Sequence, residues 1–302
     1  FNEESITPQS WSMISLANLD TSKWKPENND NATLYWWNEK MPVGEYWQYQ
    51  RLETAKDISP MNGYWFFAED SLTLPLLSKP VKAKSDTLSF ELENNYSGWN
   101  LLSNPYSWDI AINQAEAFMD AENAEEPAWV WNAKANSYEP ITTLKANTAF
   151  FMHTEETRTL SISSKPVYQE QDSTKILEKA QKTFSKDSWS LRLKLMDSDE
   201  KSGDTWNVIG VGSRSLAIEK PPVGMNQKLS LATQGNHRLL AKSIKQIGES
   251  LVWNLSLQAN VAQTAKFKIE GLNKLLEQGY IAKLLIDGKT ITIDSEDAIA
   301  LN

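Results

Sequence analysis

Cysteine is absent from the 302-residue sequence, and histidine occurs only twice, as His153 and His237. The lack of cysteine excludes disulfide bonds, thiolate zinc sites and a cysteine nucleophile. Neither histidine lies in a metal motif such as His-Glu-x-x-His, and no Gly-x-Ser-x-Gly or phosphate-binding loop occurs. His153 falls in an aromatic strand and His237 follows a turn, so we expect neither to be catalytic.

Long apolar runs are also missing. No stretch of about 18 apolar residues occurs, which excludes a transmembrane helix and predicts no membrane insertion. The chain begins Phe1-Asn2-Glu3-Glu4, without methionine. Such a start is typical of a mature or excised segment and is compatible with a leader that has been removed.

Basic residues are scarce in the first part of the chain. The net charge is −9, and residues 1–170 carry 12 Lys and Arg against 24 Asp and Glu. Residues 171–302 carry 18 against 15. The basic surface of a nucleic-acid-binding protein is therefore missing, and we expect no nucleic-acid partner. The change in charge near residue 170 predicts a domain boundary.

Tryptophan, in contrast, is abundant: the chain has 13, and ten of them lie within residues 1–131. Large aromatic side chains fill the cores of β proteins, and they also form flat surfaces that bind sugars or partner proteins. Tryptophan content alone leaves both interpretations open.

The first 170 residues contain an internal repeat. Three blocks recur in the same order, at offsets of 88, 94 and 86 residues: 10–15 with 98–103, 35–38 with 129–132, and 58–67 with 144–153. Each block is short, aromatic and bounded by Asn, Pro, Gly or Ser, which is typical of a strand. We interpret residues 1–82 and 83–170 as two copies of a small Trp-rich β unit, forming two domains or one pseudo-symmetric domain.

Residues 171–302 predict a helical linker followed by an antiparallel β-sandwich. Strict alternation over residues 189–195 indicates a strand with one buried face. Asp287-Gly288 is a hairpin signal, and regularly spaced short strands favour a sandwich. The expected strands span 189–195, 206–211, 228–231, 251–257, 265–269, 282–286 and 290–293. Helical spacing of apolar residues predicts short helices at 112–120 and 174–184. The predicted fold class is all-β with a few short helices.

The segment Gly-Trp-Asn-Leu-Leu-Ser-Asn-Pro-Tyr at residues 98–106 resembles a known family motif. It is similar to repeats that begin GWNL-small-NPY in large secreted proteins of Bacteroidetes- and Fibrobacter-like bacteria, many of which are type IX secretion substrates. In those repeats a Trp-Asn strand, a Tyr and a small-Phe-Phe strand follow, matching Trp131-Asn132, Tyr138 and residues 149–151 here. The resemblance implies a secreted or cell-surface location and the β-sandwich that often follows.

Two kinds of polar site are conceivable from the sequence. Carboxylates are plentiful, and a β fold could place two of them at the separation that glycoside hydrolysis needs. Asp197, Asp199 and Asp204 offer oxygen ligands at spaced positions, as in a calcium loop, although Lys201 and Ser202 depart from the EF-hand pattern. The alternative is a polar hairpin tip. No other cofactor is indicated.

The repeat also sorts the aromatic residues. Positions that are aromatic in both copies are expected in the core: Trp11/Trp99, Tyr35/Trp129, Trp37/Trp131, Tyr64/Phe150 and Trp65/Phe151. Aromatic residues without a counterpart are candidates for ligand binding, namely Trp24, Trp36, Trp47 and Trp108. Trp36 should point opposite to its two neighbours because strand side chains alternate. The alternative for these four is additional packing.

We therefore expect a non-catalytic secreted or cell-surface module that binds carbohydrate or neighbouring surface components through exposed aromatic rings. The first alternative is a structural stalk or assembly subunit that packs against neighbouring domains or against copies of itself. The second is a polysaccharide hydrolase with a dispersed carboxylate pair.

Overall fold

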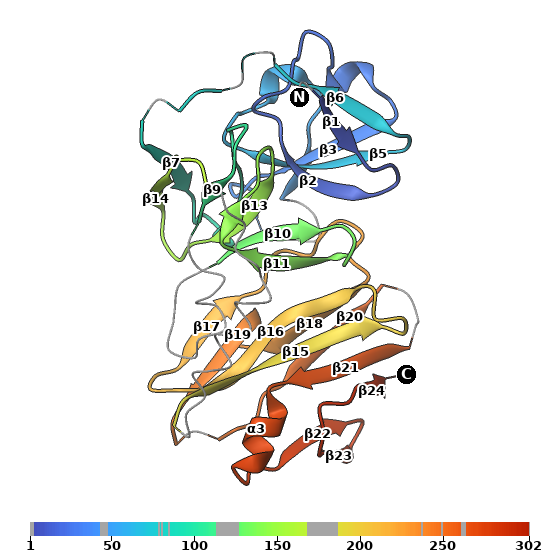
Figure 1. Ribbon diagram of the computed structural model, residues 1–302, viewed down its shortest axis with the longest axis vertical. Helices are drawn as coiled ribbons and strands as arrows, with labels where there is room; N and C mark the ends of the chain where they lie inside the picture. The colour runs from blue at the N-terminus through green and yellow to red at the C-terminus, as the bar shows by residue number, and fades with distance from the viewer. Residues whose placement is uncertain are drawn as a thin grey trace.

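The computed structural model is an elongated stack of three β regions (Figure 1). It describes residues 3–42, 48–77, 79, 81–83, 85–112, 127–167, 187–236, 238–248, 250–260 and 264–301. The first region, in blue, lies at one end of the long axis. The second, in green, lies in the middle, and the third, from yellow to red, forms the other end.

The first region contains a four-stranded sheet and a two-stranded sheet. The larger sheet has the order β2 (Trp11–Ser15), β5 (Gly63–Ala68), β3 (Ala32–Trp37) and β4 (Tyr49–Arg51). The smaller pairs β1 (Glu3–Ile6) with β6 (Leu72–Pro75), and short 3₁₀ turns span Pro26–Asn28 and Ala55–Asp57.

The second region has the same arrangement. Its larger sheet has the order β8 (Trp99–Ser103), β13 (Ala149–His153), β10 (Ala128–Asn132) and β11 (Ser137–Ile141). A two-stranded sheet pairs β7 (Thr87–Leu92) with β14 (Arg158–Ser163), and β9 (Ile110–Ala111) pairs with β12 (Thr143–Leu144).

Strand register is also equivalent in the two regions. Trp11 lies opposite Phe67 in the first region, and Trp99 lies opposite His153 in the second. These are the same positions at the offsets of 88 and 86 residues found in the sequence. Shared strand order and register support the interpretation of two copies of one unit.

The third region is built on one curved eight-stranded sheet. Its order is β20-β18-β19-β16-β15-β21-β24, with β17 paired to β19. The strands are β15 (Trp189–Asp197), β16 (Gly203–Gly212), β17 (Leu216–Glu219), β18 (Leu229–Gln234), β19 (Leu239–Gln246), β20 (Leu255–Ala259), β21 (Ala265–Glu270) and β24 (Ile299–Leu301). Helix α3 (Leu272–Glu277) and the hairpin β22 (Ala282–Ile286) and β23 (Lys289–Ile293) complete it.

Each region has a core of its own, and all three share a fourth. Alternation along the strands divides the side chains between the two faces of each sheet. In β5, for example, Tyr64 and Phe66 enter the core of the first region, whereas Trp65 enters the shared core. The shared core also contains Trp129 and Phe151 from the second region and Val208 from the third. Packing among the regions is therefore hydrophobic and continuous.

The expected all-β fold class is confirmed. Of the strands expected in the third region, 251–257 is correct only from residue 255, because Leu251–Asn254 are not in a strand. The sheet is also not purely antiparallel, since β16 and β19 pair in parallel. The helices expected at 174–184 and over most of 112–120 lie outside the described residues.

Most aromatic residues expected in the core lie there. Trp65, Trp129 and Phe151 are fully buried, and Trp11, Tyr35 and Trp37 are partly buried against the shared core. Trp36 packs against the separate core of the first region, so the expected alternation of Tyr35, Trp36 and Trp37 is confirmed.

Candidate ligand-binding cleft

The two Trp-rich regions meet through two equivalent isolated β-bridges. Ile14 pairs with Thr148, and Asn62 pairs with Leu102. In the repeat, Ile14 is equivalent to Leu102 at the offset of 88 residues, and Asn62 is equivalent to Thr148 at the offset of 86. Each region therefore gives its partner the same contact that it receives, which is the geometry of a pseudo-twofold axis.

Two serines lie at this axis. Ser15 Oγ and Ser103 Oγ, which occupy equivalent positions, are hydrogen-bonded to each other at 3.0 Å. The Ser15 amide donates to the Asn147 carbonyl at 2.7 Å, and the Ser103 amide donates to the Met61 carbonyl at 3.0 Å. Paired bonds of this kind fix how the two regions are oriented toward each other.

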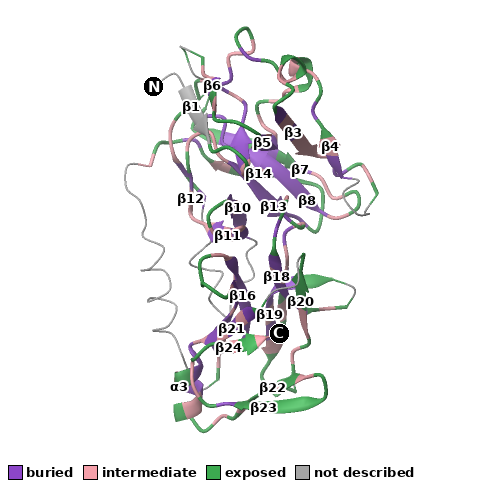
Figure 2. Cartoon of the chain, turned by 90° about the vertical axis from the view of Figure 1, so that its right-hand side faces the viewer, coloured by how far each residue is buried: buried purple, intermediate pink, exposed green. Residues whose placement is uncertain are grey.

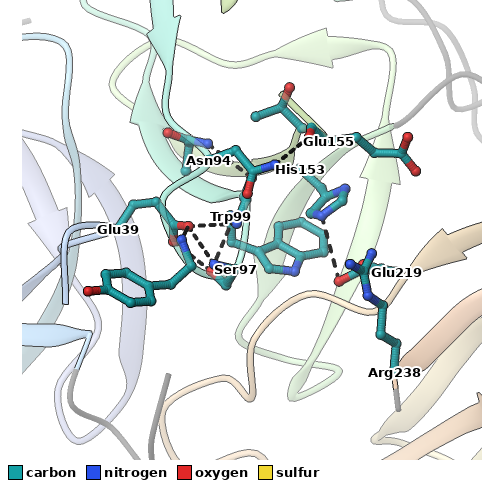
Figure 3. A network of polar contacts seen from close by, with 12 residues as sticks. Glu39, Asn94, Ser97, Trp99, His153, Glu155, Glu219 and Arg238 are labelled. Carbon is teal, nitrogen blue, oxygen red and sulfur yellow. Dashed lines mark hydrogen bonds and ion pairs between the residues drawn. The ribbon is translucent and has the colours of Figure 1, made fainter. Parts of the chain in front are cut away.

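A buried carboxylate strengthens the contact on one side of the axis only (Figure 3). Glu39 is 4% exposed and lies just after β3 of the first region. Its Oε1 accepts hydrogen bonds from the amides of Tyr96 (2.9 Å), Ser97 (2.5 Å) and Gly98 (2.6 Å), in the turn before β8. Its Oε2 accepts from Ser97 Oγ at 2.6 Å and from Gln48 Nε2 at 3.2 Å.

On the other side of the axis lies a cleft of about 340 Å³. All three regions line it, through residues within 9–11 of the first region, within 131–136 of the second, and within 201–202 and 225–228 of the third. A volume of this size is within the range of small-ligand sites.

Aromatic rings form one wall of the cleft. Trp131 is 9% exposed, and its ring packs at 5.2 Å from the rings of both Trp65 and Tyr138. The backbone of Gly224 lies against the same ring, because a Cβ at that position would come within 2.3 Å of Cζ3. Trp11, which is partly exposed, also lines the cleft. The rings are therefore held rigidly by their own packing.

Backbone and amide contacts hold the rim in place. Asn136 has a φ of 53°, in the left-handed region that asparagine tolerates. Its Nδ2 donates to the Asn226 carbonyl at 3.2 Å, and its Oδ1 accepts from the Lys228 amide at 2.7 Å. The Gly203 amide donates to the Ala135 carbonyl at 2.8 Å, which ties the β15–β16 hairpin to the second region.

The charge of the cleft is opposite to that of the protein as a whole. Lys134, Lys201 and Lys228 line it, all three are exposed, and no Asp or Glu is among its lining residues. Lys201 Nζ lies 4.0 Å from Asp199 Oδ2, in a pair that is largely solvated. Among the described residues, no ion pair involves Lys134 or Lys228. The cleft thus combines ammonium groups, amides, hydroxyls and aromatic rings.

The four tryptophans predicted to bind ligand lie elsewhere or outside the description. Trp24 is 5% exposed within the core of the first region, so the prediction is wrong for its ring. Trp36 is partly buried against the same core. Trp108 packs against the core of the second region, and its Nε1 donates to the Ser164 carbonyl at 3.0 Å. Trp47 lies outside the described residues.

The three aspartates considered as calcium ligands do not meet. Asp197 accepts from Ser202 Oγ at 2.7 Å, Asp199 is exposed, and Asp204 is buried in an ion pair with Lys220 Nζ at 2.7 Å. Within the described ranges no group of three or more His, Asp or Glu residues could hold a metal ion. The calcium interpretation is therefore wrong for this set, and the hairpin-tip alternative holds for residues 197–203.

His153 is a packing residue between regions. It is buried, and its Nε2 lies 3.6 Å from Glu219 Oε2 on β17 (Figure 3). Glu219 also pairs with Arg238. These polar contacts join the second region to the third. His237 lies outside the described residues.

No family model, curated protein or solved structure matches the chain. Within the described residues, no helix is both long and apolar enough to cross a bilayer.

Sequence reasoning missed the cleft because its residues are far apart along the chain. The lysines at 134, 201 and 228 stand in three separate loops between strands. The sequence contained one signal of the cleft. The repeat aligns Glu39 with Ala133, so a position that is charged in the first copy is uncharged in the second.

Proposed function

We propose that this chain is a non-catalytic module of a secreted or cell-surface protein that binds carbohydrate in the cleft at the junction of its three regions. The observation that carries the proposal is the meeting of Trp11 and Trp131 with amide and hydroxyl side chains in one concave site. Sugars present C–H faces to aromatic rings and hydroxyls to amides, so this mixture of groups suits them.

The resemblance of residues 98–106 to repeats of secreted bacterial surface proteins agrees with the same proposal. Rigidity supports it as well, because a preformed site loses less conformational entropy when a ligand binds. Trp131 is locked by Gly224 and its aromatic neighbours, and the rim is tied by Asn136.

The test is a glycan-binding screen with calorimetric follow-up on matched tryptophan variants. Trp11→Leu keeps an apolar side chain but removes the ring face, and should weaken binding about three- to tenfold, the equivalent of roughly 0.5–1.5 kcal/mol of aromatic contact. Trp36→Leu changes a partly buried ring that does not line the cleft, and serves as the control. Equal loss in both variants, or binding unchanged in Trp11→Leu, would count against the cleft as the binding site.

A second function, assembly through self-association, is favoured by a different observation. The far end of the third region exposes large apolar side chains: Val252 is 64% exposed, Ile281 73% and Leu285 68%. Figure 2 shows the β22–β23 hairpin mostly as exposed surface at this end. Exposed large apolar side chains commonly mark protein-binding surfaces where they gather in one patch.

Sedimentation of the chain over a range of concentrations tests this second function. Self-association that Leu285→Ser abolishes would support it. Lys283→Ser, on the same exposed face of β22, is the matched control. A monomer at every concentration would exclude a homotypic stalk and leave the carbohydrate proposal unaffected.

A further inference from the structure

We infer that the ligand of the cleft carries a carboxylate, and that an acidic saccharide such as a hexuronate oligosaccharide is the class bound. The inference rests on the proposed function and narrows it from carbohydrate to acidic carbohydrate. Its basis is the pseudo-twofold axis, which relates the repeated blocks of one Trp-rich region to those of the other.

The Glu39 site and the cleft occupy equivalent places around that axis. Glu39 contacts residues 96–98 across the interface. The offset of 94 residues converts Glu39 into Ala133, and the offset of 88 converts residues 96–98 into 8–10. Ala133, Gln9 and Ser10 all line the cleft. The cleft is therefore the place where a second internal carboxylate would lie, and alanine leaves it open.

The aromatic partner of the carboxylate is equivalent as well. Trp37 Nε1 lies 3.4 Å from Glu39 Oε2, and Trp37 corresponds to Trp131 in the cleft wall. No hydrogen bond joins Trp131 Nε1 to any described residue. An indole N–H is a donor only, so it favours an acceptor such as a carboxylate oxygen in the ligand.

The remaining donors differ in kind between the two places. Pro8 has no N–H, and the Gln9 amide is bonded to the Ala68 carbonyl at 2.7 Å, so two of the three amide donors that bind Glu39 are not reproduced. Three lysines surround the cleft instead. Ammonium groups attract an anion that arrives from solution, and charge-assisted hydrogen bonds are the stronger kind. The Glu39 site holds a carboxylate of the protein itself, whereas the equivalent cleft is suited to the carboxylate of a ligand.

The experiment measures affinity by calorimetry at low and at physiological ionic strength for a hexuronate oligosaccharide, its neutral counterpart of equal length and a sulfated counterpart. The hexuronate should bind at least tenfold more tightly than the neutral sugar, and added salt should narrow this difference. Lys134→Ala and Lys228→Ala should each weaken hexuronate binding about two- to fivefold. Lys283→Ala, on an exposed face of β22, should leave it unchanged.

The decisive variant is Ala133→Glu, which places a carboxylate where the equivalent of Glu39 would lie. It should lower hexuronate affinity at least tenfold, whereas Ala133→Gln, of the same size, should lower it far less. Equal loss in the two variants would indicate steric blocking and would overturn the inference, as would equal affinity for neutral and acidic sugars. If Ala133→Glu left the affinity for the sulfated sugar unchanged, the sugar would be held by charge attraction outside the cleft. This result would also overturn the inference. Absence of binding to every sugar would instead refute the proposed function.

Discussion

Replacing Glu39 with alanine tests how firmly the two Trp-rich regions depend on one buried carboxylate. The change leaves three amide N–H groups, those of Tyr96, Ser97 and Gly98, without their acceptor. A buried donor without a partner costs about 1–3 kcal/mol. Water can reach Tyr96, whose side chain is 54% exposed, but the contact of Gly98 is buried. We expect Glu39→Ala to lower the free energy of unfolding by about 3 kcal/mol.

Urea unfolding followed by tryptophan fluorescence would measure the change, because the ring of Trp37 lies beside Glu39. Glu93→Ala is the matched control, since Glu93 pairs with Lys40 at 3.1 Å on the surface, where an ion pair contributes at most about 1 kcal/mol. A loss below about 1 kcal/mol for Glu39→Ala would refute the reasoning. A change in m-value with the same midpoint would show instead that the two regions no longer unfold together.

Three further variants probe the frame of the cleft and of the third region. Gly224→Ala should destabilise the fold by about 1–3 kcal/mol because the new methyl overlaps the Trp131 ring, a change that thermal unfolding would detect. Lys220→Met should cost about 3–5 kcal/mol in urea unfolding, since it leaves Asp204 buried without its cation. Burial raises the pKa of Asp197, but its hydrogen bonds outweigh that effect and hold the pKa below the ordinary value. A carboxyl with a depressed folded-state pKa stabilises the fold above its unfolded pKa, near 4, and this contribution is lost as the pH falls through the folded value. The stability difference between the wild type and Asp197→Asn should therefore shrink as the pH falls below about 4, and a constant difference would contradict this assignment.

Much of the fold could be predicted from local patterns. The strands around Trp99, Trp129 and Phe151 could be predicted from their short aromatic sequences. Their apolar side chains alternate between two buried faces. β19 was missed because its sequence includes Lys242, which is fully buried in the structure. A lysine in a strand ordinarily marks a solvated face, so tertiary context overrode the pattern here.

The site could not be predicted in the same way. Absence of a repeat partner suggested that Trp24 was free to bind ligand, yet its ring fills the core beside Phe66 at 5.8 Å. A residue without an equivalent can simply complete the packing of its own copy. The cleft depends instead on a difference between the two copies: the repeat aligns Glu39 with Ala133. Only the pseudo-twofold geometry shows that Ala133 lies where a second buried carboxylate would be.

The core shared by the three regions has a consequence for how the chain folds. Met13 and Ile244 belong to the same cluster, although about three quarters of the chain separates them. Contacts this distant in sequence close late and slow the search for the native state. Until β19 has joined, the hydrophobic cluster that contains Trp65 and Trp129 lacks Ala241 and Ile244. A nascent chain must therefore reach beyond residue 244 before its most aromatic segment is protected from association with other chains.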